Sequence, residues 1–561
     1  MSQTEETEGR QTTTSFLSIA ERAALWPPAA AAAAYAVVLA VHLRRLVAAV
    51  FWNSDVASIP ILAGEMAHRA GGVANVSVAN YWSTFLFDFA TRSFPFHRGI
   101  WTGFSLATSF LAVVVLAWAA RRAAGKAAGL LVFAIALCAS PIAFHNAYEL
   151  RGPTWLTGAL LVACLVGLAE SGSGALRGAS GQKERRRRWL AVAVVGLVAG
   201  AGLASDPLLL LSGFAPLLGA AVGAWLLLRS PASARVARAA GGLAAVAVLG
   251  DVATGRIMRG LGFRIVPTLP IGLAPWSQVP ANLVLLAHSI LAFGNEEFPG
   301  VPSGVLSVAG AVTILLCLAA VGAALRFLLP LVRQRRDRDR SLALVLYVLF
   351  WTLTAVVVCA AFAFSTLPIG DVSSARYVVP VFLAIAGLAG LWAAEAGWPK
   401  IAVGVLATVF CVMSTLGIPQ VVRYWEAYPL AQEGPALVAY LEAKGLTRGY
   451  ASYWDALGLM WRGAGKIGVY PLEECAPAGE RALCPFNVNT LSTWYRPQPV
   501  PRTFLVVGLP FMPQKIADPP PSSLGSPLEV DHVGVFTVYV YAGDVATRLR
   551  SPDGPTQKAG R

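Results

Sequence analysis

The side chains best suited to do chemistry are acids placed at the ends of apolar segments. Asp55, in "FWNSDVA", directly follows the first of these segments, and Glu149 and Asp206 adjoin later ones. A carboxylate beside an apolar surface loses solvation, so its pKa rises and it can accept a proton near neutral pH. We therefore take Asp55, Glu149 and Asp206 as candidate catalytic groups.

Asp55 also has a purely structural explanation. Aspartate is a favoured N-cap residue, and a helix that begins directly after Asp55 would use its carboxylate to bind backbone N–H groups. Replacing Asp55 with Asn separates the two roles, because a cap tolerates Asn and a general base does not.

Basic side chains lie close to the same segment ends. His97 and Arg98, in "FPFHRGIW", precede the second apolar segment, and Arg376 begins the tenth. Arginine holds phosphate through paired, charge-assisted hydrogen bonds, so these three residues are candidate phosphate ligands. Ion pairs with the nearby acids are the alternative. For Arg44 and Arg45, in the last half of the first segment, extension of the side chain to lipid headgroups is equally well supported.

A further group of polar and aromatic residues is suited to binding a substrate. Flat aromatic rings contact the apolar faces of sugars, and nearby polar groups bind the hydroxyls. The candidates are Glu296, Glu297, Tyr377, Trp454 and Asp455. Trp454 and Asp455 are explained equally well as core residues of a small domain. The histidines lack the spacing of a zinc site, so a metal site built by the protein is not predicted.

The elements that carry these residues are predicted to be membrane helices. Hydrophobic residues make up 56% of the 561 residues, only 13% are charged, and the mean hydropathy is +0.61. This composition excludes a set of soluble domains. A helix needs about 20 mostly apolar residues to cross a bilayer. Eleven segments qualify: 27–50, 100–120, 128–146, 154–170, 189–205, 207–228, 237–255, 303–328, 341–366, 376–395 and 400–420. The predicted fold is a polytopic α-helical membrane protein.

The distribution of charge predicts the topology. Of the net charge of +14, residues 421–561 carry only +1, because they hold 13 Lys and Arg against 12 Asp and Glu. The other basic residues cluster in alternate connections, at 121–126, 183–188, 229–238 and 333–340. Cytoplasmic loops show this enrichment, so the charge reports orientation and not nucleic-acid binding. The N-terminus is predicted to be cytoplasmic, and everything after residue 420 extracytoplasmic.

Composition also divides the chain into four parts. We expect a disordered cytoplasmic tail over 1–26 and a transmembrane domain over 27–420, in which the first outer loop, 51–100, carries interfacial helices. An extracytoplasmic α/β domain over 421–547 and a disordered tail over 548–561 follow.

The sequence of the C-terminal domain indicates a helix, strands and a disulfide. "EGPALVAYLEAKGL" predicts a helix that begins near Pro435 and ends at Gly445. The stretches 503–509 and 533–542 are typical of strands. Cys475 and Cys484 lie in a compartment expected to be oxidising, which favours a disulfide over two free thiols.

Three short motifs together resemble the GT-C superfamily of membrane glycosyltransferases: "NSD" after the first segment, "FPFHR" before the second, and "SARYVVPVF" at the tenth. The chain looks most like bacterial relatives of the aminoarabinose and protein O-mannosyl transferases. The resemblance implies transfer of a sugar from a polyprenyl-phosphate donor to a glycan, lipid or protein acceptor.

The resemblance also implies roles for individual residues. Asp55 would be the base, with Glu149 or Asp206 as a second acid, and His97, Arg98 and Arg376 would contact the carrier phosphate. Many relatives have paired acids in the first outer loop, whereas Ser54 and Val56 flank Asp55 here, so a divalent metal is unsupported.

Two other functions fit parts of the sequence. A transporter or flippase for a lipid or amphiphile would place charged residues along a path through the membrane. A non-enzymatic cell-envelope assembly protein would use the aromatic residues of the C-terminal domain as a binding surface. The richness in Ala, Gly, Arg and Val is typical of a high-GC bacterial genome, which predicts the bacterial plasma membrane as the location.

Overall fold

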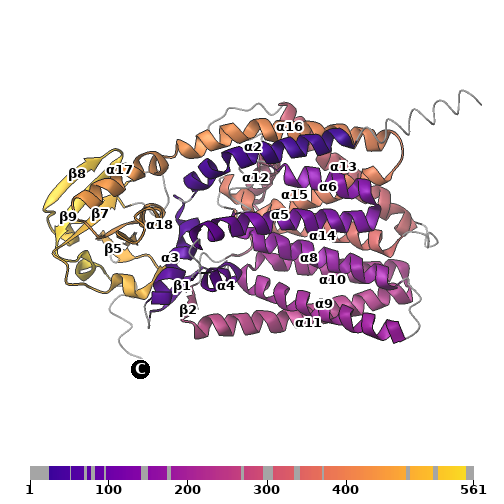
Figure 1. Ribbon diagram of the computed structural model, residues 1–561, viewed down its shortest axis with the longest axis horizontal. Helices are drawn as coiled ribbons and strands as arrows, with labels where there is room; N and C mark the ends of the chain where they lie inside the picture. Colours follow the sequence, from indigo (N-terminus) through magenta and orange to yellow (C-terminus); the bar gives the residue numbers. More distant parts are fainter. Residues whose placement is uncertain are drawn as a thin grey trace, which may run out of the picture.

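The protein is a bundle of helices with a sheet domain at one end (Figure 1). We call the end that carries the sheet domain the sheet end, and the opposite end the far end. The computed structural model describes residues 25–50, 52–68, 72–77, 82–91, 93, 97–139, 149–172, 179–266, 271–294, 307–333, 341–368, 372–475, 481–508 and 516–550.

Within these residues, eight helical segments are long and apolar enough to cross a membrane. They are α2 (Trp26–Val50), α5 (His97–Ala124), α8 (Glu149–Gly172), α10 (Ala215–Leu228) with the π-turn before it (Leu210–Phe214), α11 (Pro231–Gly260), α13 (Val308–Arg333), α14 (Leu342–Phe364) and α16 (Trp398–Glu426). The chain is therefore a polytopic helical membrane protein, which confirms the predicted class.

Shorter apolar helices complete the bundle. They are α6 (Lys126–Leu137), the apolar part of α9 (Ala179–Ser205), α12 (Val279–Ala292), and α15 (Val379–Ala389) with the 3-10 turn after it (Gly390–Ala394). The first outer loop of the prediction contains α3 (Ser54–His68) and α4 (Trp82–Thr91).

Helix α12 was not expected, because it lies between the predicted segments 237–255 and 303–328, where no membrane helix was predicted. It has 14 residues, or roughly 21 Å at 1.5 Å per residue, which is too short to cross about 30 Å of hydrocarbon. The amide of Asn282 on α12 donates to the backbone oxygens of Ala363 and Ser365, each at 3.0 Å, at the end of α14. This contact holds α12 against the end of α14. The helix is too short to be found by a search for full-length membrane spans.

Close helix contacts in the bundle depend on small residues. Helices α9 and α11 lie side by side (Figure 1), and a Cβ atom at Gly200 would collide with the backbone oxygen of Ala247. Membrane helices have no hydrophobic driving force to associate in lipid, so tight backbone approach of this kind stabilises their packing.

The sheet domain contains a six-stranded mixed sheet in the order β5-β4-β3-β7-β9-β8. Its elements are α17 (Pro429–Ala443), β3 (Arg448–Ser452), α18 (Tyr453–Arg462), β4 (Gly468–Cys475), β5 (Ala482–Pro485), β7 (Arg502–Val507), β8 (Glu529–Val533) and β9 (Phe536–Ala542). Strand β3 is parallel to both β4 and β7, and the other pairs are antiparallel. The C-terminal mixed α/β domain of the predicted fold is therefore present.

Details of the sheet domain follow the sequence closely, with one difference. The strands predicted at 503–509 and 533–542 are β7 and β9, and Gly445, with φ of +66°, ends α17. Helix α17 begins at Pro429, six residues before Pro435, because Pro429 is also suited to a first turn. A disulfide joins Cys475 and Cys484, whose Cα atoms are 5.9 Å apart, and links β4 to β5.

Candidate functional site

Asp55 lies in the first turn of α3, directly after the turn that follows α2. The side chain of Asn53 accepts a hydrogen bond from the backbone N–H of Asp55 at 2.9 Å, so Asn53 caps this helix. The alternative that Asp55 is an N-cap is therefore wrong. The carboxylate of Asp55 is instead engaged by side chains from two other parts of the chain.

Those partners are a tyrosine of the sheet domain and an arginine of the bundle. Tyr453 donates its hydroxyl to Oδ1 of Asp55 at 2.6 Å, and Nη1 of Arg376 lies 3.9 Å from Oδ2. The amide of Asn489 donates to the Tyr453 hydroxyl at 2.9 Å. About a quarter of each charged side chain remains exposed, 25% for Asp55 and 24% for Arg376. The carboxylate is thus held in one orientation and is still open to a ligand.

Helix α18 places Tyr453 next to Asp55. Tyr453 is the first residue of α18, at the carboxyl end of β3, and ligand sites in α/β sheets commonly lie at the carboxyl ends of parallel strands. The hydroxyl of Ser54 donates to the backbone oxygen of Trp454 at 3.2 Å. A Cβ atom at Gly458 would collide with the backbone oxygen of Trp52, so α18 packs directly on the turn between α2 and α3.

A second, three-stranded sheet fixes the position of Asn489. Strands β1 (Ala74–Val76), β2 (Phe263–Ile265) and β6 (Thr490–Leu491) form it in the order β2-β1-β6. It joins three segments that are far apart in the sequence, two of them from connections in the bundle and one from the sheet domain. Because Asn489 directly precedes β6, this pairing places its amide against Tyr453.

Arg376 is connected to a second arginine through Tyr377. The guanidinium carbons of Arg376 and Arg151 lie 5.1 Å and 5.2 Å from the centre of the Tyr377 ring, distances typical of cation–π contacts. Arg376 also donates to the Tyr377 hydroxyl at 3.1 Å. Tyr377 therefore contacts both arginines.

Asp206 is enclosed in an ion pair with Arg151. The two side chains are 2.6 Å apart and almost completely buried, with 5% of Arg151 and 2% of Asp206 exposed. The hydroxyl of Thr154 and the backbone N–H of Leu208 each donate to Asp206 at 3.1 Å. Both carboxylate oxygens thus have partners within the bundle, which is the geometry of a structural pair.

Asp455 is buried at the start of α18 and accepts a hydrogen bond from the Ser452 hydroxyl at 2.7 Å. Burial raises the pKa of Asp455 to about 6. Trp454 is half-buried and packs against the Tyr453 ring, with the ring centres 5.2 Å apart. Trp454 is therefore better placed than Asp455 to contact a ligand.

Several candidates from the sequence have no described side chain. Glu296 and Glu297 lie outside the described residues. His97 and Arg98 begin α5 and Glu149 begins α8, but their side chains also lie outside the described part. In the part of the chain that the structure describes, no group of three or more His, Cys, Asp or Glu residues is arranged to hold a metal ion.

Tyr453, Asn489 and Arg151 were missed by the sequence analysis. Tyr453 precedes the singled-out pair Trp454 and Asp455, and Arg151 follows Glu149 by two positions. Tyr453 and Arg151 were therefore close to residues that were selected, whereas Asn489 was not. No local pattern distinguishes these three, because their role comes from contacts across long stretches of sequence.

Comparison with known proteins gives only distant matches. No family model matches the chain, and no curated protein matches its sequence. Among solved structures, the oligosaccharyltransferase of Archaeoglobus fulgidus tethered to an acceptor peptide matches with a TM-score of 0.39 and 12% identity, over 77% of this chain and 63% of that chain. Its apo form matches with a TM-score of 0.38 and 14% identity, over 76% and 64%.

A third structure is described as archaeal oligosaccharyltransferase AglB from Archaeoglobus fulgidus with an inhibitory peptide and a dolichol-phosphate. It matches with a TM-score of 0.38 and 13% identity, over 77% of this chain and 64% of that one. The chain thus spans less than two thirds of the length of these proteins. The likeness is distant and assigns no activity.

Proposed function

We propose that the protein is a membrane glycosyltransferase that moves a sugar from a polyprenyl-phosphate donor to an acceptor at the sheet end. The observation that carries the proposal is the environment of Asp55. A partly exposed carboxylate lies between an arginine of the bundle and a tyrosine of the sheet domain. A donor held in the membrane and an acceptor bound beside the sheet domain would meet at this position.

In the proposed reaction, Asp55 acts as the general base. It takes the proton from an acceptor hydroxyl as the hydroxyl oxygen attacks the anomeric carbon of the sugar. The bond between that carbon and the phosphate oxygen breaks, and polyprenyl phosphate leaves with the electron pair. Arg376 stabilises the negative charge on the departing phosphate. A single displacement of this kind inverts the configuration at the anomeric carbon.

The other roles implied by the family resemblance are part of the proposal. His97 and Arg98, at the start of α5, would add contacts to the phosphate, with Glu149 as a second acid. For Asp206, the closed ion pair with Arg151 favours a structural role. Tyr453 and Asn489 would orient the base. Tyr377 and Trp454 are the described side chains best placed to contact a substrate.

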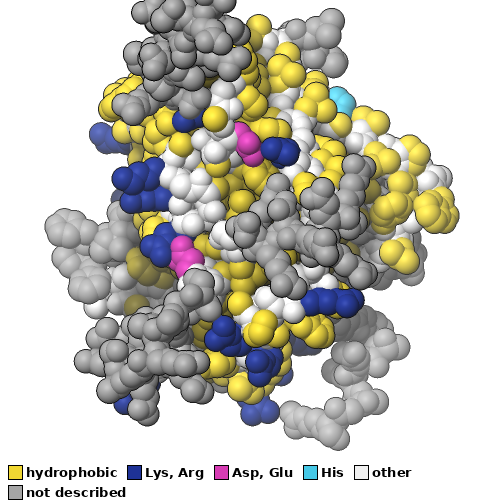
Figure 2. All heavy atoms as spheres, turned by 90° about the vertical axis from the view of Figure 1, so that its right-hand side faces the viewer, with side chains coloured by type: hydrophobic (Ala, Val, Ile, Leu, Met, Phe, Trp, Pro, Cys, Tyr) yellow, Lys and Arg dark blue, Asp and Glu magenta, His cyan; other side chains and the backbone are white. Residues whose placement is uncertain are grey.

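We further propose that the far end faces the cytoplasm of a bacterium and the sheet end lies outside the plasma membrane. Figure 2 shows the far end, where Lys and Arg side chains are spread over the surface with few acidic ones. Arg121, Arg122, Lys126, Arg229 and Lys400 lie in or next to connections between membrane helices. Enrichment of this kind marks cytoplasmic loops, and a disulfide at the sheet end suits an oxidising compartment.

The proposed domains follow from this orientation. Residues 27–420 form the transmembrane domain and 421–547 the extracytoplasmic domain. Helix α16 crosses the boundary and ends at Glu426, so it connects the two domains directly.

The test is donor turnover by the purified, full-length protein with a panel of polyprenyl-phosphate sugars. Release of polyprenyl phosphate is measured for the wild type, Asp55→Asn and the control Asp251→Asn, which makes the same change on α11 away from the site. Loss of general-base catalysis costs about 10²- to 10⁴-fold in rate, so Asp55→Asn is expected to lose release by this factor with an unchanged Tm. Undiminished release in Asp55→Asn would refute Asp55 as the base.

A further inference from the structure

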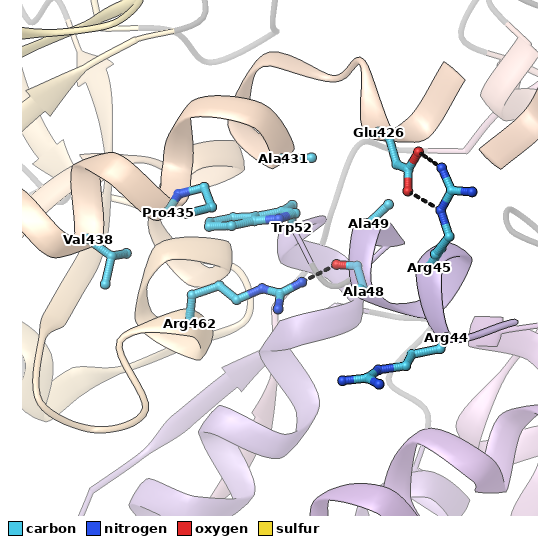
Figure 3. Close-up of a pocket in the computed structure, with 10 residues that line it drawn as sticks. All are labelled: Arg44, Arg45, Ala48, Ala49, Trp52, Glu426, Ala431, Pro435, Val438 and Arg462. Carbon is cyan, nitrogen blue, oxygen red and sulfur yellow. Dashed lines mark hydrogen bonds and ion pairs between the residues drawn. The ribbon is translucent and has the colours of Figure 1, made fainter. Parts of the chain in front are cut away.

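A pocket of about 770 Å³ opens at the junction of the bundle and the sheet domain. The last turns of α2 and Trp52 in the turn after it form one wall, and residues of α16, α17 and α18 form the rest (Figure 3). Three arginines and one acid line it, namely Arg44, Arg45, Arg462 and Glu426. Asp55, Tyr453 and Arg376 are not among its lining residues, so the pocket is separate from the site proposed for sugar transfer.

The charges of the pocket favour an anion. Arg45 is neutralised by a bidentate ion pair with Glu426, at 2.7 Å and 2.6 Å. Arg462 lies over the Trp52 ring at 4.9 Å and donates to the backbone oxygen of Ala48. Arg44 has no ion pair or hydrogen bond with any residue that the structure describes.

Among the described lining residues, arginines outnumber acids by three to one, so basic groups predominate in the pocket. Figure 3 shows Arg44 on α2 and Arg462 on α18 among the side chains that line the pocket, with the Trp52 ring beside Arg462. Arginine groups that approach from two helices are suited to hold a phosphate by charge-assisted hydrogen bonds.

The surface of α2 below the pocket indicates what kind of phosphate would bind. Arg44 lies six residues before Val50, or roughly 9 Å from the end of the membrane helix. Val37 and Val41 precede it by seven and three residues, so they lie on the same face of the helix. They are 64% and 72% exposed, which is the expected state of side chains that face lipid chains. A lipid can therefore place its acyl chains on Val37 and Val41 and its phosphate at Arg44.

We propose that this pocket binds the phosphate headgroup of an anionic bilayer lipid. The apolar strip of α2 favours a lipid over a free phosphate, because a free phosphate would make no use of it. Arg44 belongs to the bundle and Arg462 to the sheet domain, so a phosphate held by both fastens the two parts together. The bound lipid thereby stabilises the junction next to which Asp55 and Tyr453 meet.

The experiment measures the Tm of the full-length protein in detergent micelles as lipid is added. The probes are dioleoyl phosphatidylglycerol, dioleoyl phosphatidylcholine and inorganic phosphate. Phosphatidylglycerol is expected to raise the Tm of the wild type in a saturable way, with no comparable rise from the other two. No sugar donor is present, so the result is independent of the proposed transferase activity.

Two substitutions in the pocket are expected to have opposite effects. One basic side chain at a membrane surface contributes about a fivefold change in affinity for anionic lipid, so Arg44→Gln should raise the half-saturating lipid fraction about fivefold. Glu426→Gln removes the acid found among the described lining residues and should lower that fraction. Arg264→Gln removes an exposed arginine on β2, outside the pocket, and should change nothing.

Three results would overturn the proposal. Arg44→Gln with wild-type lipid dependence and a wild-type Tm without lipid would show that the pocket does not bind the headgroup. An equal rise in Tm with inorganic phosphate would assign the site to a free anion. An equal rise with phosphatidylcholine would show that the charge of the pocket is irrelevant.

Discussion

Two pairs of arginine and aspartate at the sheet end differ in how tightly they are held. Arg151 and Asp206 are 2.6 Å apart, with 5% and 2% of their side chains exposed. Arg376 and Asp55 are 3.9 Å apart, and about a quarter of each side chain is exposed. Tyr377 contacts both arginines, so the two pairs lie close together and share a neighbour.

The difference separates a structural pair from a pair that is able to react. A buried ion pair must satisfy its charges internally because solvent cannot, and Asp206 does so with an arginine, a hydroxyl and a backbone N–H. Asp55 has one short hydrogen bond, to Tyr453, and a longer contact with Arg376. The remaining capacity of Asp55 to accept hydrogen bonds is available to a ligand.

The largest effect on stability is expected from breaking the closed pair. Arg151→Gln leaves the Asp206 carboxylate buried without its cation, which costs about 3–5 kcal/mol in the free energy of unfolding. The effect is measured as a lower Tm of the purified protein in detergent. Arg376→Gln is the matched change in the open pair, and its loss of stability should be much smaller because both partners remain accessible to water.

A double replacement decides the role of Asp206. Arg151→Met with Asp206→Leu removes both charges together, and such replacements are often neutral for stability. If Asp206 is structural, the double variant should fold and release polyprenyl phosphate at a rate near that of the wild type. A folded double variant without activity would instead support the catalytic role that the sequence predicted for Asp206.

The next effect concerns the hydrogen bond from Tyr453 to Asp55 in the open pair. Tyr453→Phe removes the hydroxyl that orients Asp55, and a hydrogen bond to a charged group contributes about 1.5–3 kcal/mol. Polyprenyl phosphate release should therefore slow by about 10- to 100-fold, mainly in kcat. Tyr539→Phe removes a similar tyrosine–aspartate contact, with Asp518 in the sheet domain, and should leave release unchanged. Equal activity in both variants would show that Tyr453 does not position the base.

The smallest effect concerns Asp455, a buried acid whose described hydrogen-bond partner is Ser452. Burial raises its pKa from the ordinary 3.8 to about 6. Between about pH 4 and pH 6 the native state keeps a proton that the unfolded chain loses, so the stability contributed by this group falls as the pH rises through that window. Asp455→Asn removes the penalty and should raise the stability at pH 7 by about 1–3 kcal/mol.

The measurement for Asp455 is the difference in Tm between the variant and the wild type from pH 4.5 to pH 7.5, which should grow with pH. Asp531→Asn is expected to change the stability at pH 7 in the opposite direction. The hydrogen bond from Tyr440 lowers the pKa of Asp531, so this acid stabilises the protein when it is ionised and its replacement should cost stability at pH 7. A constant difference for Asp455→Asn across the range would contradict the burial of a titrating carboxyl group.

Part of the site was predictable from the sequence because the relevant signals are local. Asp55 and Arg376 were both selected as polar residues at the ends of apolar segments, and the structure brings them to 3.9 Å. Asp206 was selected by the same rule, but its partner Arg151 was not, so its enclosure in a buried pair was not foreseen. The rule finds charged residues near the membrane surface and does not distinguish closed pairs from open ones.

The sequence did not predict which of two neighbouring residues caps α3, and it did not predict the short helix α12. The choice of Asn53 over Asp55 as the cap of α3 depends on where the turn after α2 ends, and both residue types are good caps. Helix α12 lies below the length that marks a spanning segment. A hydrogen bond from Asn282 holds it against the end of α14, about 80 residues further along the chain.

The sequence by itself determined that the chain crosses the membrane many times, that a mixed α/β domain follows the last membrane helix, and that acids gather at segment ends. These properties depend on apolar runs, on the alternation of strand residues and on charge, all of which act over neighbouring positions. Only the tertiary structure decided which groups meet Asp55. Tyr453 is 398 positions away from it, and their contact exists because the small Gly458 lets α18 pack on the turn between α2 and α3.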